Sequence, residues 1–185
     1  IMALSTSDNR NHTRKTLKKN YFSVSFDKAY LADFYKVYCT RMHELGSPSP
    51  KLSFFENFLA FCPEQTYLLT VLDQSNDKIV GGMILLADPE RRILHYPYGS
   101  CLVRYNSKYI NNFMYWEAVK LAKELEMEYL DLGRSPLDSG TYRYKKHWGA
   151  LPQQLSYCLY SGGRQVALPD KENMSLFIKI WQILP

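Results

Sequence analysis

The apolar and polar positions of the chain change their spacing several times, and each spacing predicts a helix or a strand. Apolar residues at helical spacing predict helices over about residues 28–45, 52–61 and 108–126. Alternating or continuous apolar runs predict strands over about residues 21–26, 66–72, 79–87, 92–98, 128–132 and 154–160. The stretches between the three central strands, 73–77 and 88–90, are polar and turn-forming, so we expect hairpins there. This order predicts a mixed α/β domain with its strands clustered centrally.

The longest predicted helix follows the third central strand. Asn106 or Ser107 is expected to cap its start. Its apolar stripe consists of Ile110, Met114, Ala118, Leu121 and Leu125. A stripe of this kind is expected to cover one face of the sheet.

The two ends of the chain differ from the middle. Residues 1–20 are polar and basic with little to bury, which predicts a tail or linker ahead of a domain over residues 21–165. Residues 166–185 are expected to form a C-terminal extension, helical from about residue 174 to 184. Nothing later in the chain covers the apolar face of that helix, and Ile1 precedes Met2, so we expect a piece of a longer protein.

Length, charge and cysteine content narrow the function classes. A chain of 185 residues can bury one good core, and a net charge of +5 permits a phosphate-bearing partner without requiring one. Only this modest charge supports a nucleic-acid-binding module, because the sequence contains no basic–aromatic motif of the usual kind. The four cysteines are widely separated, so we expect no metal site. No apolar run approaches the roughly 20 residues needed to cross a bilayer and no secretory signal is present, which predicts a cytoplasmic protein.

The stretch after the predicted strand at 128–132 carries most of the candidate chemistry. Asp131, Gly133, Arg134 and Ser135 end the strand, and a short basic and aromatic segment follows over residues 142–149. These residues place a carboxylate and several cations at the mouth of a sheet, which suits a reaction that develops negative charge on oxygen. Spacing alone favours a packing role for the aromatic residues of this segment, with its cations on a solvated face.

The element order, together with the run from Asp131 to Ser135, the pair Tyr144-Lys145 and the later pair Trp148-Gly149, resembles the GNAT acyltransferase fold. Within that fold the residues resemble the FemAB-like group, which includes aminoacyltransferases of peptidoglycan bridge formation and related proteins of exopolysaccharide and exosortase gene neighbourhoods. The resemblance covers nearly all of residues 10–185. It implies a mostly antiparallel central sheet flanked by helices, and a second GNAT-like domain that follows a first one.

The resemblance also implies roles for particular side chains. Lys145 matches a lysine that steadies developing charge near the reacting ester, although a surface lysine is an equal alternative. Asp131 and Arg134 are expected to form an ion pair that positions Lys145. His95 lies on the strand that lines the acyl cleft, where a packed or solvent-facing histidine is the alternative to a general base. The substrate is expected to contact Arg104, Tyr142, Tyr144 and Trp148.

The acyl donor stays open between an acyl-CoA and an aminoacyl-tRNA. Enzymes of the fold that use acetyl-CoA carry a glycine loop ahead of the long helix, whereas residues 104–108 here contain no glycine. The basic residues 14–19 are expected to lie on a solvated linker helix, and the alternative is that they contact the phosphates of a tRNA or of a nucleotide-linked acceptor. The function expected is transfer of an acyl or aminoacyl group to an amine of a small molecule or of a cell-wall or exopolysaccharide precursor, by direct attack and without a metal. The alternative is a non-catalytic domain that binds a glycan or a carrier-linked ligand.

Overall fold

The computed structural model describes residues 2–158, 160, 162–163, 178 and 181–183. Its centre is a five-stranded sheet in the spatial order β1-β2-β3-β4-β5. The first four strands are antiparallel to their neighbours, and β5 is parallel to β4. The strands are β1 Phe22–Ser25, β2 Thr66–Asp73, β3 Lys78–Asp88, β4 Ile93–Cys101 and β5 Tyr129–Asp131. The prediction of a mixed α/β domain with a mostly antiparallel sheet is confirmed.

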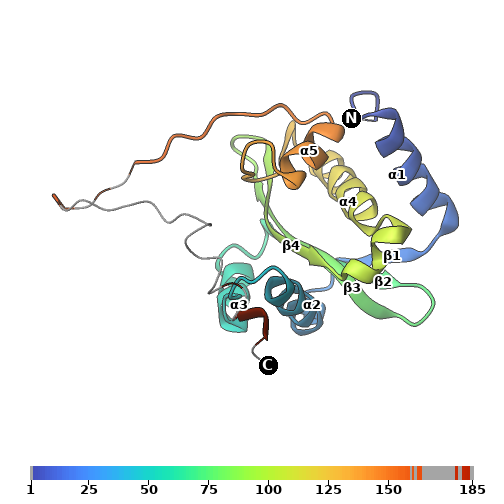
Figure 1. The fold of residues 1–185 in the computed structure, drawn as a ribbon, viewed down its shortest axis with the longest axis horizontal. Helices are drawn as coiled ribbons and strands as arrows, with labels where there is room; N and C mark the ends of the chain where they lie inside the picture. Colours follow the sequence, from blue (N-terminus) through green and yellow to red (C-terminus); the bar gives the residue numbers. More distant parts are fainter. Residues whose placement is uncertain (1, 159, 161, 164–177, 179–180, 184–185) are drawn as a thin grey trace.

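Helices cover both faces of the sheet (Figure 1). One face carries α1 (Ser7–Lys19) and α4 (Ile110–Glu124), and the other carries α2 (Leu31–Glu44) and α3 (Leu52–Phe61). The remaining helical elements are η1 Lys28–Tyr30, η2 Val103–Lys108 and α5 Gly140–His147. Among the residues that the structure describes, no helix is long and apolar enough to cross a membrane.

Strand alternation divides the core into two layers. On the α4 side, Leu69, Met83 and Leu94 are fully buried against the helix, and on the α2 and α3 side, Leu68 and Ile84 are fully buried. Each such side chain contributes about 1.5–3 kcal/mol by leaving water. Because both faces are covered, β2 and β3 are buried at most of their positions.

The tail or linker expected over residues 1–20 is replaced by a helix. Helix α1 packs on α4, and Asn112 Nδ2 of α4 donates to Asn9 Oδ1 at 2.7 Å and to Thr13 Oγ1 at 3.3 Å. Asn9 and Thr13 are buried, and Thr6 caps the helix by accepting from the Asn9 N–H. This helix–helix contact is largely polar, so the sequence shows no apolar stripe that would have predicted it.

Three further expectations differ from the structure. Helix α4 is preceded by η2 and begins after Tyr109, which has a φ of +59°, so neither Asn106 nor Ser107 caps it. Residues 154–158 form no strand, because no described strand lies beside them to pair with. Ile178 and residues 181–183 are helical, whereas the rest of the helix predicted over 174–184 lies outside the described residues.

A buried carboxylate at the end of β2 makes stability depend on pH. Burial alone raises the pKa of Asp73, but hydrogen bonds from Ser75 and Tyr105 and the charge of Lys108 lower it from 3.8 to about 2. The folded pKa lies below the unfolded one, so the stabilisation is complete above about pH 4 and is lost as the pH falls towards 2. We expect Asp73→Asn to cost about 2 kcal/mol at pH 6. Urea unfolding at pH 6, 4 and 2.5 should show that difference shrinking with pH, and a constant difference would contradict this origin.

Candidate active site

The strands β4 and β5 part beside a polar cluster. They pair at three positions, Ile93 with Tyr129, Leu94 with Leu130 and His95 with Asp131. Leu94 and Leu130 pack into the core on the α4 side, so alternation places the side chains of His95 and Asp131 together on the opposite face. After Asp131 the chain turns at Gly133, whose φ is +70°, while β4 continues to Cys101.

A bulge in β4 follows immediately after His95. His95 is opposite Leu86 of β3 and Tyr98 is opposite Ile84, so β4 advances by three residues where β3 advances by two. Pro97 lies within the bulge, where it has no N–H to leave unpaired. Beyond His95, no strand among the described residues lies along the outer edge of β4. The part of β4 beyond His95 therefore has no described strand partner on that side, and its far end, at Ser100 and Cys101, is buried.

His95 and Asp131 form a hydrogen-bonded pair. His95 Nδ1 lies 3.0 Å from Asp131 Oδ2, and Asp131 Oδ1 accepts from the Gly133 N–H at 2.8 Å. Burial alone raises the pKa of Asp131, but the Gly133 N–H, His95 and the charge of Lys145 together lower it below its usual value. An ionised carboxylate can only accept, so Nδ1 carries the hydrogen and the neutral ring has its lone pair on Nε2. The His95 side chain is 33% exposed and within reach of a ligand.

Lys145 joins this pair to the turn that follows β5. It lies on α5, and its ammonium donates to the carbonyl oxygens of Gly133 and Arg134, both at 3.0 Å. Burial lowers the pKa of Lys145, and the attraction of Asp131 opposes that shift. The ammonium has three N–H groups, so one remains after these two hydrogen bonds.

The other predicted ligand contacts are not brought to this cluster. The ion pair expected between Asp131 and Arg134 is wrong, because Asp131 pairs with His95 while the Arg134 side chain is exposed. Arg104 lies past the far end of β4, over the ring of Tyr105. Tyr142 is half-buried beneath the ammonium of Lys146, at 5.7 Å.

Tyr144 and Trp148 pack in the core. Both rings contact Tyr115 of α4, at centroid distances of 5.3 Å and 5.6 Å, and Tyr96 meets the same ring at 5.7 Å. Burial raises the pKa of Tyr96, Tyr115 and Tyr144 well above the ordinary tyrosine value, so these phenols stay neutral. Trp148 is only 5% exposed and has no surface to offer a substrate. These rings attach α5 to α4 and so fix the place of Lys145.

The start of α4 is occupied by aromatic and charged contacts. The ring of His12 stacks on Tyr109 at 4.2 Å, and the ammonium of Lys15 lies over the same ring at 5.3 Å. Lys108 Nζ lies 3.6 Å from Asp73 and close to the rings of Tyr21 and Tyr105. The stretch that lacks glycine is therefore a 3₁₀ turn, and the residue that follows it, Tyr109, contacts His12 and Lys15 of α1.

Metal ligands are not gathered in the described part of the chain, where no three His, Cys, Asp or Glu residues come together. The His95–Asp131 pair was missed because Asp131 was matched with Arg134, its neighbour in sequence. The alternation of side chains along the two strands could have predicted this pair. A long helix between β4 and β5 makes these strands parallel neighbours, and the apolar Leu94 and Leu130 then assign the next residue of each strand to the same face.

Comparison with known proteins identifies the family. Residues 7–146 match the family described as the acetyltransferase (GNAT) domain. Three similar solved structures are FemX (TM-score 0.70, 16% identity, 80% of this chain and 55% of that one), an aminoglycoside acetyltransferase from an uncultured soil metagenomic sample (0.61, 11%, 77% and 97%) and a possible acetyltransferase from Clostridium difficile 630 (0.62, 11%, 76% and 97%). At such identities these likenesses show the fold, and the chain spans 55% of the FemX chain. A search of curated proteins finds no match. Because the family match covers most of its length, the chain belongs to the GNAT acetyltransferase family.

Proposed function

We propose that this chain transfers an acyl or aminoacyl group to an amine by direct attack of the amine on the donor carbonyl. The observation that carries the proposal is the His95–Asp131 pair, held beside Lys145 where β4 and β5 part. Acyl transfer to an amine uses a base that takes the proton of the amine and a positive charge that stabilises the developing oxyanion, and His95 and Lys145 can supply these two.

The proposed step begins with the amine nitrogen attacking the carbonyl carbon. His95 Nε2 takes the proton that the nitrogen loses, and Asp131 stabilises the resulting imidazolium through Nδ1. The remaining N–H of Lys145 offsets the negative charge that develops on oxygen. The bond from carbon to the leaving sulfur or oxygen then breaks, and the leaving group takes the proton that His95 Nε2 holds, which returns the imidazole to its neutral form. No covalent enzyme intermediate is required.

The donor proposed is an acyl thioester of CoA or an aminoacyl ester of tRNA. The unpaired edge of β4 supports the CoA thioester, because the amide groups of a pantetheine arm can hydrogen-bond to it like an added strand. The exposed basic residues Arg14, Lys18 and Lys19 of α1 would meet the phosphates of a tRNA. The acceptor proposed is a small molecule or an amine of a cell-wall or exopolysaccharide precursor, with a preceding GNAT-like domain in the complete protein. The FemX likeness supports this proposal.

The 3₁₀ turn before α4 predicts that the nucleotide part of CoA contributes little to binding. Without a loop of free N–H groups, the pyrophosphate gains few hydrogen bonds, so the nucleotide half of CoA adds little affinity. We expect acetyl-CoA and acetyl-pantetheine to bind with dissociation constants within about fivefold, about 1 kcal/mol. Isothermal titration calorimetry at 0.1 M salt compares them, and a preference of a hundredfold or more for acetyl-CoA would show a working pyrophosphate site.

Turnover of defined donors tests the proposed function. Acetyl-CoA is assayed by thiol release and alanyl-tRNA by loss of the ester, each with glucosamine or an amine-bearing muropeptide as acceptor. We expect amide formation with at least one pair, dependent on His95. Saturable binding of an acceptor without turnover, in the complete protein and with both donors, would instead support a non-catalytic binding domain.

A further inference from the structure

The bulge in β4 brings an aromatic side chain next to His95. Residues three apart on a regular strand face opposite sides of a sheet, but the extra residue in the bulge turns Tyr98 to the same side as His95. Their partners on β3, Ile84 and Leu86, are two residues apart, so the Cα atoms of His95 and Tyr98 are about 7 Å apart. Tyr98 is therefore the next side chain after His95 along this face of β4.

Helix α3 packs aromatic rings against Tyr98. Phe54, Phe55 and Phe58 meet its ring edge to face, at centroid distances of 5.7, 5.2 and 5.9 Å. Phe55 is buried in the core, whereas Phe54 is 41% exposed and Phe58 and Tyr98 are half-buried. We call Phe54, Phe58 and Tyr98 the aromatic ledge. It presents apolar ring surface to water on the same face of the sheet as His95.

The other neighbours of His95 on this face are carboxylates. Asp131 of β5 is hydrogen-bonded to it, and Asp88 of β3 lies one cross-strand position away on the same face. Asp88 accepts from the Arg91 backbone N–H at 3.1 Å and from its guanidinium at 2.9 Å, one bond to each oxygen. Each carboxylate oxygen has two lone pairs, so both groups can accept further hydrogen bonds from a ligand.

This surface favours a ligand with one apolar face and a polar rim. The ledge covers only one side of a ligand, so a long alkyl amine would leave most of its chain in water. A pyranose ring has C–H groups on its faces, which suit the negative face of an aromatic ring, and hydroxyl groups around its rim, which can donate to carboxylates. The spacing of His95 and Tyr98 leaves room for one such ring.

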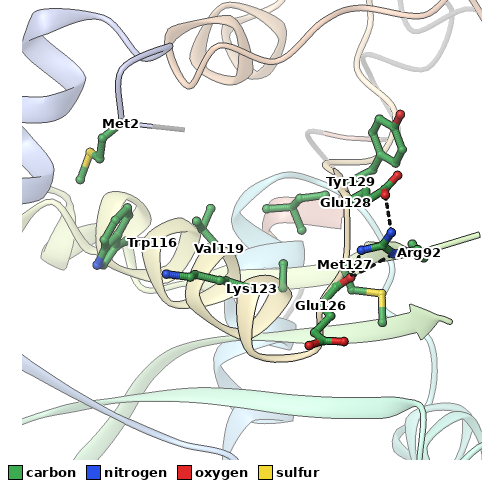
Figure 2. A pocket seen from close by; sticks show the side chains of 11 residues that line it. Met2, Arg92, Trp116, Val119, Lys123, Glu126, Met127, Glu128 and Tyr129 are labelled. Carbon is green, nitrogen blue, oxygen red and sulfur yellow. Dashed lines mark hydrogen bonds and ion pairs between the residues drawn. The ribbon is translucent and has the colours of Figure 1, made fainter.

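The open groove of about 580 Å³ beside α4 is a different surface. Trp116 and Val119 of α4 line it together with Leu130, which packs towards α4 (Figure 2). Its rim is already paired, because Figure 2 shows Arg92 bonded to Glu128 and to the backbone at residue 126. An amine bound on this side would lie across the sheet from His95.

We propose that the acceptor is an amino sugar, whose ring stacks on the aromatic ledge and whose amine points to His95. Phe54 is then the specificity-determining residue, because it is the most exposed ring of the ledge. The position of the amine rests on the proposed acyl transfer, whereas stacking of the sugar ring is measured without a donor.

Titration followed by NMR, with no donor present, compares a ring with an open chain. Methyl β-D-glucosaminide is the ring amine, and glucamine is the open-chain amine with similar hydroxyl groups. We expect the wild-type chain to bind the glucosaminide at least about tenfold more tightly. Phe54→Ala, and Phe54→Leu, which keeps more of the packed volume, should each reduce this preference to about twofold or less. Phe61→Ala, at a phenylalanine that is 89% exposed at the end of α3, is the matched control and should keep it.

Circular dichroism melting checks that the variants are folded. Equal affinity for the two amines, no saturable binding of the glucosaminide up to about 100 mM, or a ring preference that survives both Phe54 variants overturns the proposal. Tighter binding of hexylamine than of the glucosaminide overturns the amino-sugar class. Turnover assays separate this inference from the proposed function. Amide formation without a ring preference contradicts the ledge alone, and a ring preference without turnover contradicts acyl transfer alone.

Discussion

A His95→Gln variant is expected to lose about 10²–10⁴-fold in kcat with little change in stability. Glutamine can keep a hydrogen bond to Asp131 but has no nitrogen that accepts a proton at neutral pH. The His95 side chain is 33% exposed and its polar partner is a half-exposed carboxylate, so its removal should change the free energy of unfolding by at most about 1 kcal/mol. Steady-state kinetics with the best donor and acceptor pair, alongside thermal unfolding, measures both quantities.

The controls for this prediction come from the same chain. His147→Gln changes an exposed histidine on α5 outside the pair and should leave kcat within twofold of wild type. Asp131→Asn should lower kcat by less than His95→Gln, with KM unchanged, because Asp131 acts by orienting His95. Asp131→Glu should recover part of that loss. A His95→Gln enzyme with wild-type kcat would remove His95 from the reaction.

The strands and the two helices on the α2 side follow directly from apolar spacing. The predicted ranges 66–72, 79–87 and 92–98 each begin and end within three residues of an observed central strand, and helix α3 matches its predicted range. These segments are buried on at least one face, so their apolar residues recur at the spacing of the helix or strand that they form. Gly46, with a φ of +70°, follows α2 as expected of a helix terminator.

Elements that depend on polar or distant contacts were not predictable in the same way. Helix α1 is held through Asn9, Thr13 and Asn112, a contact between segments about a hundred residues apart. The aromatic contacts of Tyr115 likewise join α4 to α5. A strand needs a neighbouring strand as well as an apolar pattern, and no described strand lies beside residues 154–158, which form no strand.

The same reasoning separates the residues of the candidate site. The sequence alone indicated His95, Asp131 and Lys145 as candidate site residues, because each is a polar or charged residue in or next to a predicted strand or basic segment. Their contacts depend on the strand register. The pairing of β4 with β5 places His95 opposite Asp131, and the turn at Gly133 and Arg134 brings two backbone carbonyl groups within hydrogen-bond distance of Lys145. Sequence neighbours such as Arg134 were therefore poor guides to contact.

Replacing Lys145 by alanine is the second large effect expected, a loss of about 10²–10³-fold in kcat. The variant removes the cation that the proposed reaction uses to stabilise the oxyanion. It also leaves the Gly133 and Arg134 carbonyls without their hydrogen-bond donor, so a fall in stability of about 1–3 kcal/mol should accompany it. Lys146→Ala is the matched control, because that neighbour is exposed over Tyr142 and should leave kcat unchanged.

The loss of stability and the loss of rate at Lys145 can be separated. Lys145→Met keeps most of the packed stem without the charge, so its stability should recover further than its rate. If Lys145 instead only holds the turn, kcat should recover in step with the melting temperature across the alanine, methionine and arginine variants. Charge stabilisation predicts that both uncharged variants stay slow even when folded, because a methyl thioether cannot offset an oxyanion.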